Sequence, residues 1–170
     1  MSSIQSNIQG AFARQHESPR LETGKPMLIA GLRGYFSTAD SDAIPEQWQR
    51  LEFYGNIRGT VGRAHYGLCF HEPNGIEYLS GVEVTGIAGT LGELSHARIP
   101  AQTYAVFPHR EHVSKLGDTL DVIWNEWLPE SGLEVAPAQK GMPDFFERYG
   151  EDFDPRTGYG DVEVWVPIKS

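Results

Sequence analysis

Two segments, IEYLSGVEVTG (76–86) and DVEVWVPIK (161–169), carry the same Val-Glu-Val triplet in the two halves of the chain. In the second segment every other residue from Val162 to Ile168 is a branched aliphatic, which is the alternation of a strand with one buried face. The shared triplet suggests that the chain contains two copies of one unit, and the residues before each segment support this interpretation.

The residues before the first segment predict a strand, a helix and a hairpin. MLIAGLRGYF (27–36) is apolar and β-like, and DSDAIP (40–45) is a helix start with polar caps and an early proline. HYGLCFHE (65–72) is a short strand, joined to 76–86 by the turn residues PNG. On the helix we expect Ile44, Trp48 and Leu51 to be buried, and Glu46, Gln47, Gln49 and Arg50 to lie outside.

The residues before the second segment follow the same order. ELSHARIPAQTYAVFPHRE (93–111) is strand-like with an interruption at Pro100, PDFFERYG (143–150) is a strand, and EDFDPRTGYG (151–160) is a loop. Between the strand-like segment 93–111 and the strand 143–150 lies the most amphipathic helix of the chain. Its apolar stripe consists of Leu116, Leu120, Ile123, Trp124, Trp127 and Leu128.

We expect Ser114 to cap this second helix and the residues PESG (129–132) to close it. Trp48 and Trp127 lie in the middle of their stripes and are assigned to the core. Trp124 lies at the edge of its stripe, so it can face either the core or a ligand.

Each half therefore has the order β-α-β-β, which indicates an internal duplication with a pseudo-two-fold axis. The predicted fold class is α+β: tandem SHS2-like β-α-β-β units that form an antiparallel sheet with two main helices. We expect residues 1–25 to be a flexible leader or edge strand and residues 26–170 to be one domain, with repeats at 26–90 and 91–170. A ligand cleft is expected where the two halves meet.

Composition narrows the possible partners. The 170 residues carry a net charge of −9, and the residues after position 110 include thirteen acidic and five basic side chains. These acids either form a solvated surface or, in part, attract a cation. A nucleic-acid partner needs a basic face, so no direct nucleic-acid binding is expected. The apolar runs are far shorter than the ~20 residues of a membrane span, so we expect no membrane partner.

The N-terminal residues 1–26 are polar and lack the apolar region of a secretory signal, so a cytoplasmic location is expected. Cys69 is the only cysteine, which excludes an internal disulfide. We expect no cofactor and no metal. The pair His109 and His112 has no third ligand at a recognised spacing, and phosphate-loop, zincin, nucleophile-elbow and dinucleotide-binding motifs are absent.

Five segments follow one another along the chain: IEYLSGVEV (76–84), IPAQTYAVFPHR (99–110), WNEWLPESG (124–132), PDFFERY (143–149) and VEVWVPI (162–168). Taken in this order, they resemble the GyrI-like small-molecule-binding family, also known as the effector-binding domain of AraC-type and MerR-type multidrug regulators. The resemblance covers about residues 26–169 and implies the duplicated fold described above. Some family members are fused to helix-turn-helix domains, and we expect that half to be missing here, leaving a stand-alone member.

The resemblance implies a groove for bulky, often cationic aromatic compounds, with aromatic walls and a buried carboxylate, which the motif Phe146-Glu147-Arg148-Tyr149 places at Glu147. A carboxylate among aromatics is costly to bury without a partner. An organic cation can supply the missing charge, and each aromatic face adds ~0.5–2 kcal/mol of cation–π attraction. The predicted ligand-binding residues are Glu147, Tyr149, Phe145, Tyr78, Tyr104, Phe107, Trp124 and Trp165.

Other interpretations stay open. Glu147 can instead pair with Arg148, Lys140 or Arg110, or simply face water. We expect a binding protein for aromatic, cationic molecules rather than an enzyme. If the chain is an enzyme, the resemblance implies a hydrolase of cyclopropane-type toxins with Glu147 as general acid or base and Tyr149 or Tyr104 assisting. A gyrase-inhibitor-type module that binds an unknown protein partner is the third possibility.

Overall fold

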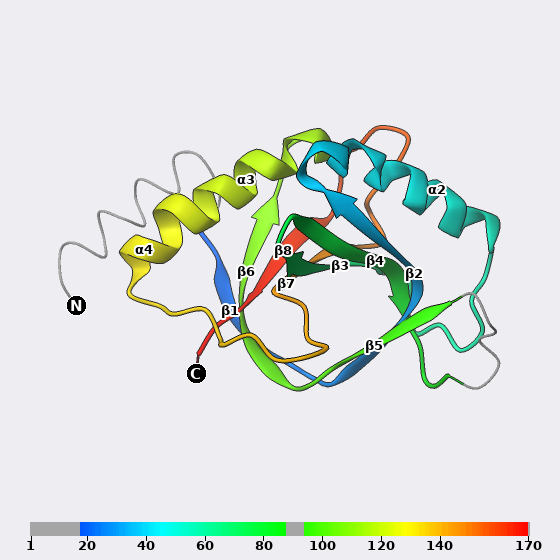
Figure 1. Cartoon of the computed structure of the whole chain (residues 1–170), viewed down its shortest axis with the longest axis horizontal. Coiled ribbons are helices and arrows are strands. Elements are labelled where there is room, and N and C mark those ends of the chain that lie inside the picture. Colours follow the sequence, from blue (N-terminus) through cyan, green and yellow to red (C-terminus); the bar gives the residue numbers. More distant parts are fainter. Residues whose placement is uncertain (1–17, 88–93, 170) are drawn as a thin grey trace.

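Eight antiparallel strands form one curled sheet, with the order β1-β6-β8-β7-β3-β4-β2-β5, in the computed structural model, which describes residues 18–87 and 94–169 (Figure 1). The main helices lie on the same face of the sheet, and the sheet curls away from them. The strands are β1 (Arg20–Gly24), β2 (Met27–Ser37), β3 (His65–Glu72), β4 (Gly75–Glu83), β5 (Ser95–Ile99), β6 (Gln102–His109), β7 (Phe145–Tyr149) and β8 (Val162–Pro167). The helical segments are η1 (Thr38–Ala43), α2 (Ile44–Phe53), η2 (Val113–Lys115), α3 (Leu116–Val122), the π-helical turn η3 (Ile123–Trp127) and α4 (Leu128–Ser131).

The predicted duplication is present in this topology. The first unit is β2-α2-β3-β4 and the second is β6-α3-β7-β8, in which η3 and α4 continue α3. Within each unit the last strand lies between the other two, and β3 of the first unit pairs with β7 of the second. Gly67 is opposite Glu147 in this central pair. The predicted α+β fold, with its antiparallel sheet and two main helices, is confirmed.

Each unit also receives a strand from the segment that precedes the other one. β1 pairs with β6 and β5 pairs with β2, so residues 20–24 form an edge strand. The pairs Gly24↔Gln102 and Met27↔Ile99 continue a single register through the two bends. Proline cannot donate a ladder hydrogen bond, and a proline lies at each bend, Pro26 and Pro100. Residues 1–17, which belong to the expected leader, lie outside the described residues.

The alternation of each strand divides the side chains between a helix-side face and an inner face. On β8 the valines at 162, 164 and 166 lie on the helix side, as expected, and are buried against the helix formed by α3, η3 and α4. Trp165 points the other way and stacks on Phe146 of β7 at 5.4 Å between ring centroids. The sheet therefore carries separate packed layers on its two faces.

Gln47 corrects the prediction for the first helix. Its side chain is fully buried rather than outside, because position 47 is one turn before Leu51 and shares its face. The two N–H groups of Gln47 Nε2 are shared among three acceptors at 2.9–3.0 Å: the Leu32 carbonyl, the Tyr78 carbonyl and Ser80 Oγ. Gln47 therefore links α2 to β2 and β4 through hydrogen bonds that periodicity alone does not reveal.

The second helix differs from its prediction at both ends. Ser114 is not its N-cap: Ser114 lies inside the turn η2, whose N-cap His112 accepts from the Ser114 backbone N–H through Nδ1 at 3.1 Å, and Lys115, the N-cap of α3, makes no side-chain cap hydrogen bond. Pro129 lies inside the helix, just after the π-helical turn, and only Gly132, with φ at 80°, ends it. A π-helical turn is a common way to accommodate a helical irregularity. Trp127 is buried against Phe107, which confirms its assignment to the core.

Replacing Gln47 with alanine should lower the free energy of unfolding by about 1–3 kcal/mol, because it leaves buried carbonyl groups without their donor. Urea denaturation followed by tryptophan fluorescence measures the change. Gln49→Ala, on the exposed face of the same helix, is the matched control and should change stability by less than about 0.5 kcal/mol. Equal effects of the two substitutions would contradict the role assigned to Gln47.

Candidate functional site

A buried carboxylate lies where the two units meet. Glu147 is in the middle of β7, its side chain faces the helices, and only 8% of the residue is exposed. Its Oε1 accepts hydrogen bonds from Tyr78 Oη at 2.7 Å and from Tyr149 Oη at 2.8 Å. Tyr149 is two residues along the same strand, and Tyr78 comes from β4 of the first unit. Both repeats therefore contribute to this group.

Gly67 makes room for these contacts. It is the pairing partner of Glu147 across β3 and β7, and a Cβ atom there would lie 2.6 Å from Tyr78 Cζ and 2.8 Å from Glu147 Oε1. These separations are shorter than van der Waals contact allows. Any side chain at position 67 would displace the carboxylate or the Tyr78 phenol.

Trp48 of α2 covers the two tyrosines. Its indole Nε1 donates to Tyr78 Oη at 3.2 Å, and its ring centroid is 5.5 Å from that of Tyr149 in an edge-on arrangement. The sequence assigned Trp48 to the core, but the residue is only half-buried and contacts two candidate site residues. The signal that could have revealed it is the indole N–H, which needs an acceptor when the stripe around it is apolar.

Burial sets the acid–base behaviour of the group. It raises the pKa of Glu147 above its ordinary value near 4.5, and the hydrogen bonds from Tyr78 and Tyr149 offset part of this effect by favouring the anion. Burial next to the carboxylate raises the pKa of Tyr78 and of Tyr149 well above the usual phenol range. Both phenols therefore stay protonated and serve as hydrogen-bond donors.

Among the described residues no lysine or arginine forms an ion pair with Glu147. Arg148, the neighbour in sequence, points to the inner face and pairs with Asp161 and Glu163 at 3.5 and 3.7 Å. Lys140 and Arg110 line two other cavities. The carboxylate therefore has two neutral hydrogen-bond donors as partners and no described cation.

The structure groups five of the eight predicted ligand-binding residues. Glu147, Tyr149 and Phe145 share the helix-side face of β7, and Tyr78 joins them from β4. Trp124, which is 36% exposed, packs against Phe145 at 5.2 Å between ring centroids. These five residues and Trp48 are called the Glu147 cluster below.

The other three predicted residues lie elsewhere. Phe107 is on the helix-side face but is fully buried against Trp127. Tyr104 and Trp165 are on the inner face, where they pack against each other and against Phe146 at 5.3–5.4 Å between ring centroids. Strand alternation explains the separation, because even-numbered positions of β6 and odd-numbered positions of β8 both face inward.

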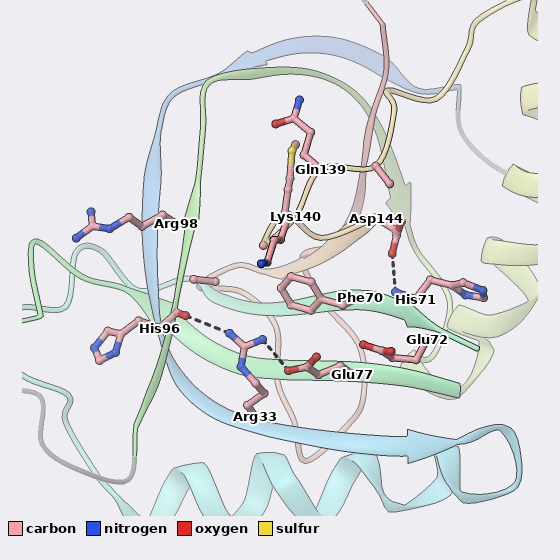
Figure 2. A pocket seen from close by; sticks show the side chains of 14 residues that line it. Arg33, Phe70, His71, Glu72, Glu77, His96, Arg98, Gln139, Lys140 and Asp144 are labelled. Carbon is pink, nitrogen blue, oxygen red and sulfur yellow. Dashed lines mark hydrogen bonds and ion pairs between the residues drawn. The ribbon is translucent and has the colours of Figure 1, made fainter. Parts of the chain in front are cut away.

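A cavity of about 540 Å³ lies on the inner face, away from the Glu147 cluster (Figure 2). Its wall includes Phe70 and the ion pair of Arg33 with Glu77 at 2.8 Å. The guanidinium of Arg33 lies over the Phe70 ring at 5.2 Å. Asp144 fixes the facing loop by accepting from the backbone N–H of His71. Unlike the Glu147 cluster, this cavity contains an ion pair between an acidic and a basic side chain, Glu77 and Arg33.

The Glu147 cluster offers an anion, two phenol donors and several aromatic rings, which are the groups that attract an organic cation or transfer a proton. Within residues 18–87 and 94–169 no three His, Cys, Asp or Glu side chains are placed to hold a metal ion. The described helices include none with the length and apolar character needed to cross a bilayer.

Comparison with known proteins gives three findings. Residues 17–169 match the family model for the GyrI-like small molecule binding domain. The transcriptional regulator BrlR of Pseudomonas aeruginosa is 29% identical over 168 residues, which cover 95% of this chain but only 57% of that protein. SAV2435, solved bound to tetraphenylphosphonium, has a TM-score of 0.67 at 21% identity, covering 89% of this chain and 94% of that one.

Two further solved structures share the fold. The EcmrR C-terminal domain has a TM-score of 0.63 at 13% identity and covers 89% of this chain and 97% of its own. A hydrolase from Listeria innocua has a TM-score of 0.56 at 11% identity, and the match covers 95% of this chain and 98% of the hydrolase. At such identities the likeness concerns the fold alone. Because the family model spans nearly the whole chain, this protein belongs to the GyrI-like small-molecule-binding domain family.

Proposed function

We propose that this GyrI-like domain binds amphipathic aromatic cations at the Glu147 cluster. One observation carries the proposal: a buried carboxylate whose described partners are two neutral phenols. An ionised carboxylate removed from water is stable only when it is paired or hydrogen-bonded. The phenols meet part of this requirement, and a ligand cation would meet the remainder.

The surrounding rings suit the apolar part of such a ligand. Trp48, Tyr149, Phe145 and Trp124 present aromatic surface around the carboxylate, and aromatic faces attract cations through their quadrupole. Trp124 is the exposed member of the group. A ligand would enter beside Trp124 and reach Glu147 by displacing Trp48, whose indole makes one hydrogen bond to Tyr78 and edge-on ring contacts with Tyr78 and Tyr149.

The relatives support a sensing or sequestering role. SAV2435 binds tetraphenylphosphonium, an aromatic cation, and its fold is the same. BrlR is a transcriptional regulator, of which this chain spans 57%. We infer that the domain reports or removes such cations. Its partners would be small molecules rather than nucleic acid, since the net charge of −9 disfavours a polyanion.

A catalytic role is the second candidate, favoured by the raised pKa of Glu147. A carboxyl group that keeps its proton to higher pH can act as a general acid, and Tyr149 is within hydrogen-bond distance to assist. Mass spectrometry of a cyclopropane-bearing electrophile incubated with the protein separates the roles: product formation supports catalysis, and unchanged electrophile supports binding alone.

Glu147→Gln should weaken the binding of tetraphenylphosphonium at least about tenfold, or about 1.4 kcal/mol, because the substitution removes the only negative charge of the cluster. Quenching of tryptophan fluorescence measures the affinity. Glu130→Gln, an exposed carboxylate in α4, is the matched control and should leave the affinity unchanged. Equal affinities of the wild-type and Glu147→Gln proteins would refute the assignment of Glu147.

Affinity for a permanent cation should fall as the pH is lowered through the raised pKa of Glu147, because the protonated carboxyl carries no charge. Tetraphenylphosphonium has no titrating group, so any change of affinity in a pH series from about 8 to about 4 comes from titration of the protein. The decline should begin at a higher pH than an ordinary glutamate, with a pKa near 4.5, would produce. It should be absent from Glu147→Gln.

The ligand-free protein should show the opposite dependence. The folded chain keeps the proton of Glu147 to a higher pH than the unfolded chain, whose glutamate titrates near 4.5. The stabilising contribution of this proton is full below that value and is lost as the pH rises through the folded pKa. Denaturant titrations should therefore show wild type losing stability relative to Glu147→Gln across this interval, and a constant difference would count against the raised pKa.

A further inference from the structure

The two oxygens of Glu147 are not equivalent. Oε1 accepts both phenol hydrogen bonds, from Tyr78 and from Tyr149. Among the described residues no donor contacts Oε2. The residue as a whole is 8% exposed, so Oε2 is a largely buried acceptor to which the described residues bring no donor. The carboxylate is thus anchored through Oε1, while Oε2 has no described donor.

A carboxylate oxygen without a described donor distinguishes two kinds of cation. A protonated amine can donate an N–H to Oε2 at the short distance of a charge-assisted hydrogen bond, about 2.7–2.9 Å. A quaternary ammonium or phosphonium has no such proton, and its substituents hold the positive charge farther from the oxygen. A hydrogen bond to a charged group contributes about 1.5–3 kcal/mol, which corresponds to at least about a tenfold difference in affinity.

We propose that the Glu147 cluster selects aromatic cations that carry an N–H donor, namely protonated amines, over quaternary cations of the same shape, and that Oε2 is the atom that discriminates. This inference rests on the proposed binding function and specifies its ligand class. An amine that leaves water must find an acceptor for its proton, and Oε2 is the acceptor of the cluster without a described donor.

The two phenols also fix what happens when the charge is removed. In Glu147→Gln the amide oxygen can keep the Oε1 position and accept from Tyr78 and Tyr149, which places the amide nitrogen at the Oε2 position. That nitrogen is a donor, so it opposes an incoming N–H. The substitution should therefore abolish the preference for the amine and not only weaken binding in general.

The experiment compares diphenhydramine, a diphenylmethyl ether with a tertiary amine, with its N-methyl quaternary salt by calorimetry at about pH 7.5. The amine should bind wild type at least about tenfold more tightly. In Glu147→Gln the two affinities should be equal or reversed. Glu130→Gln should retain the wild-type ratio. Thermal melts of each variant without ligand establish that the variants are folded.

The outcomes separate this inference from the proposed function. If both compounds bind wild type equally and both lose affinity in Glu147→Gln, Glu147 holds the cation but Oε2 does not discriminate, and this inference alone fails. If neither compound nor tetraphenylphosphonium binds, the proposed function fails as well. The role of the amine proton is checked by raising the pH above the pKa of the amine, which should lower the affinity of the amine but not that of the quaternary salt. An equal loss of affinity for both compounds would contradict the proposed hydrogen bond to Oε2.

Discussion

The pairing of β3 with β7 is the contact on which the rest of the molecule depends, because it joins the two repeats at the centre of the sheet. It sets Gly67 opposite Glu147, so the residue that faces the carboxylate across the strand pair has no side chain. The β3–β4 pairing then fixes Tyr78 within reach of Glu147. A shift of β7 by one residue would turn Glu147 to the inner face, and the cluster would not exist.

The Glu147 cluster illustrates how a costly group is retained. A buried carboxylate has a large desolvation penalty, and here the two phenols offset it only in part, as the raised pKa indicates. Trp48 of α2 donates a hydrogen bond to Tyr78, so a chain of hydrogen bonds runs from α2 through Tyr78 to the carboxylate. By contrast, Glu163, the other buried carboxylate among the described residues, accepts from Trp165 and pairs with Arg20 and Arg148. The difference in partners is what marks Glu147 as a candidate binding group.

Several sequence predictions failed where polarity or periodicity was the wrong guide. Gln47 was placed outside because its side chain is polar, although it shares the buried face of its helix and its amide satisfies backbone carbonyls. The ligand-binding role of Tyr104 and Trp165 stays a prediction: the register of β6 and β8 directs both to the inner face, where Trp165 covers its sheet neighbours Tyr104 and Phe146 rather than the Glu147 cluster. Ser114 fits the statistics of a helix cap, yet the ring of His112 accepts the hydrogen bond.

The sequence by itself determined the order of the elements and the duplication, because strand alternation, helical stripes and the repeated Val-Glu-Val triplet are local patterns. The choice of Glu147 as the central carboxylate came from the resemblance of Phe146-Glu147-Arg148-Tyr149 to the family motif. Only the tertiary structure decided which aromatic residues surround that carboxylate and how the repeats exchange β1 and β5. It also decided that both phenols bind the same oxygen. These features depend on strand register and on contacts between residues distant along the chain, and no local pattern encodes either.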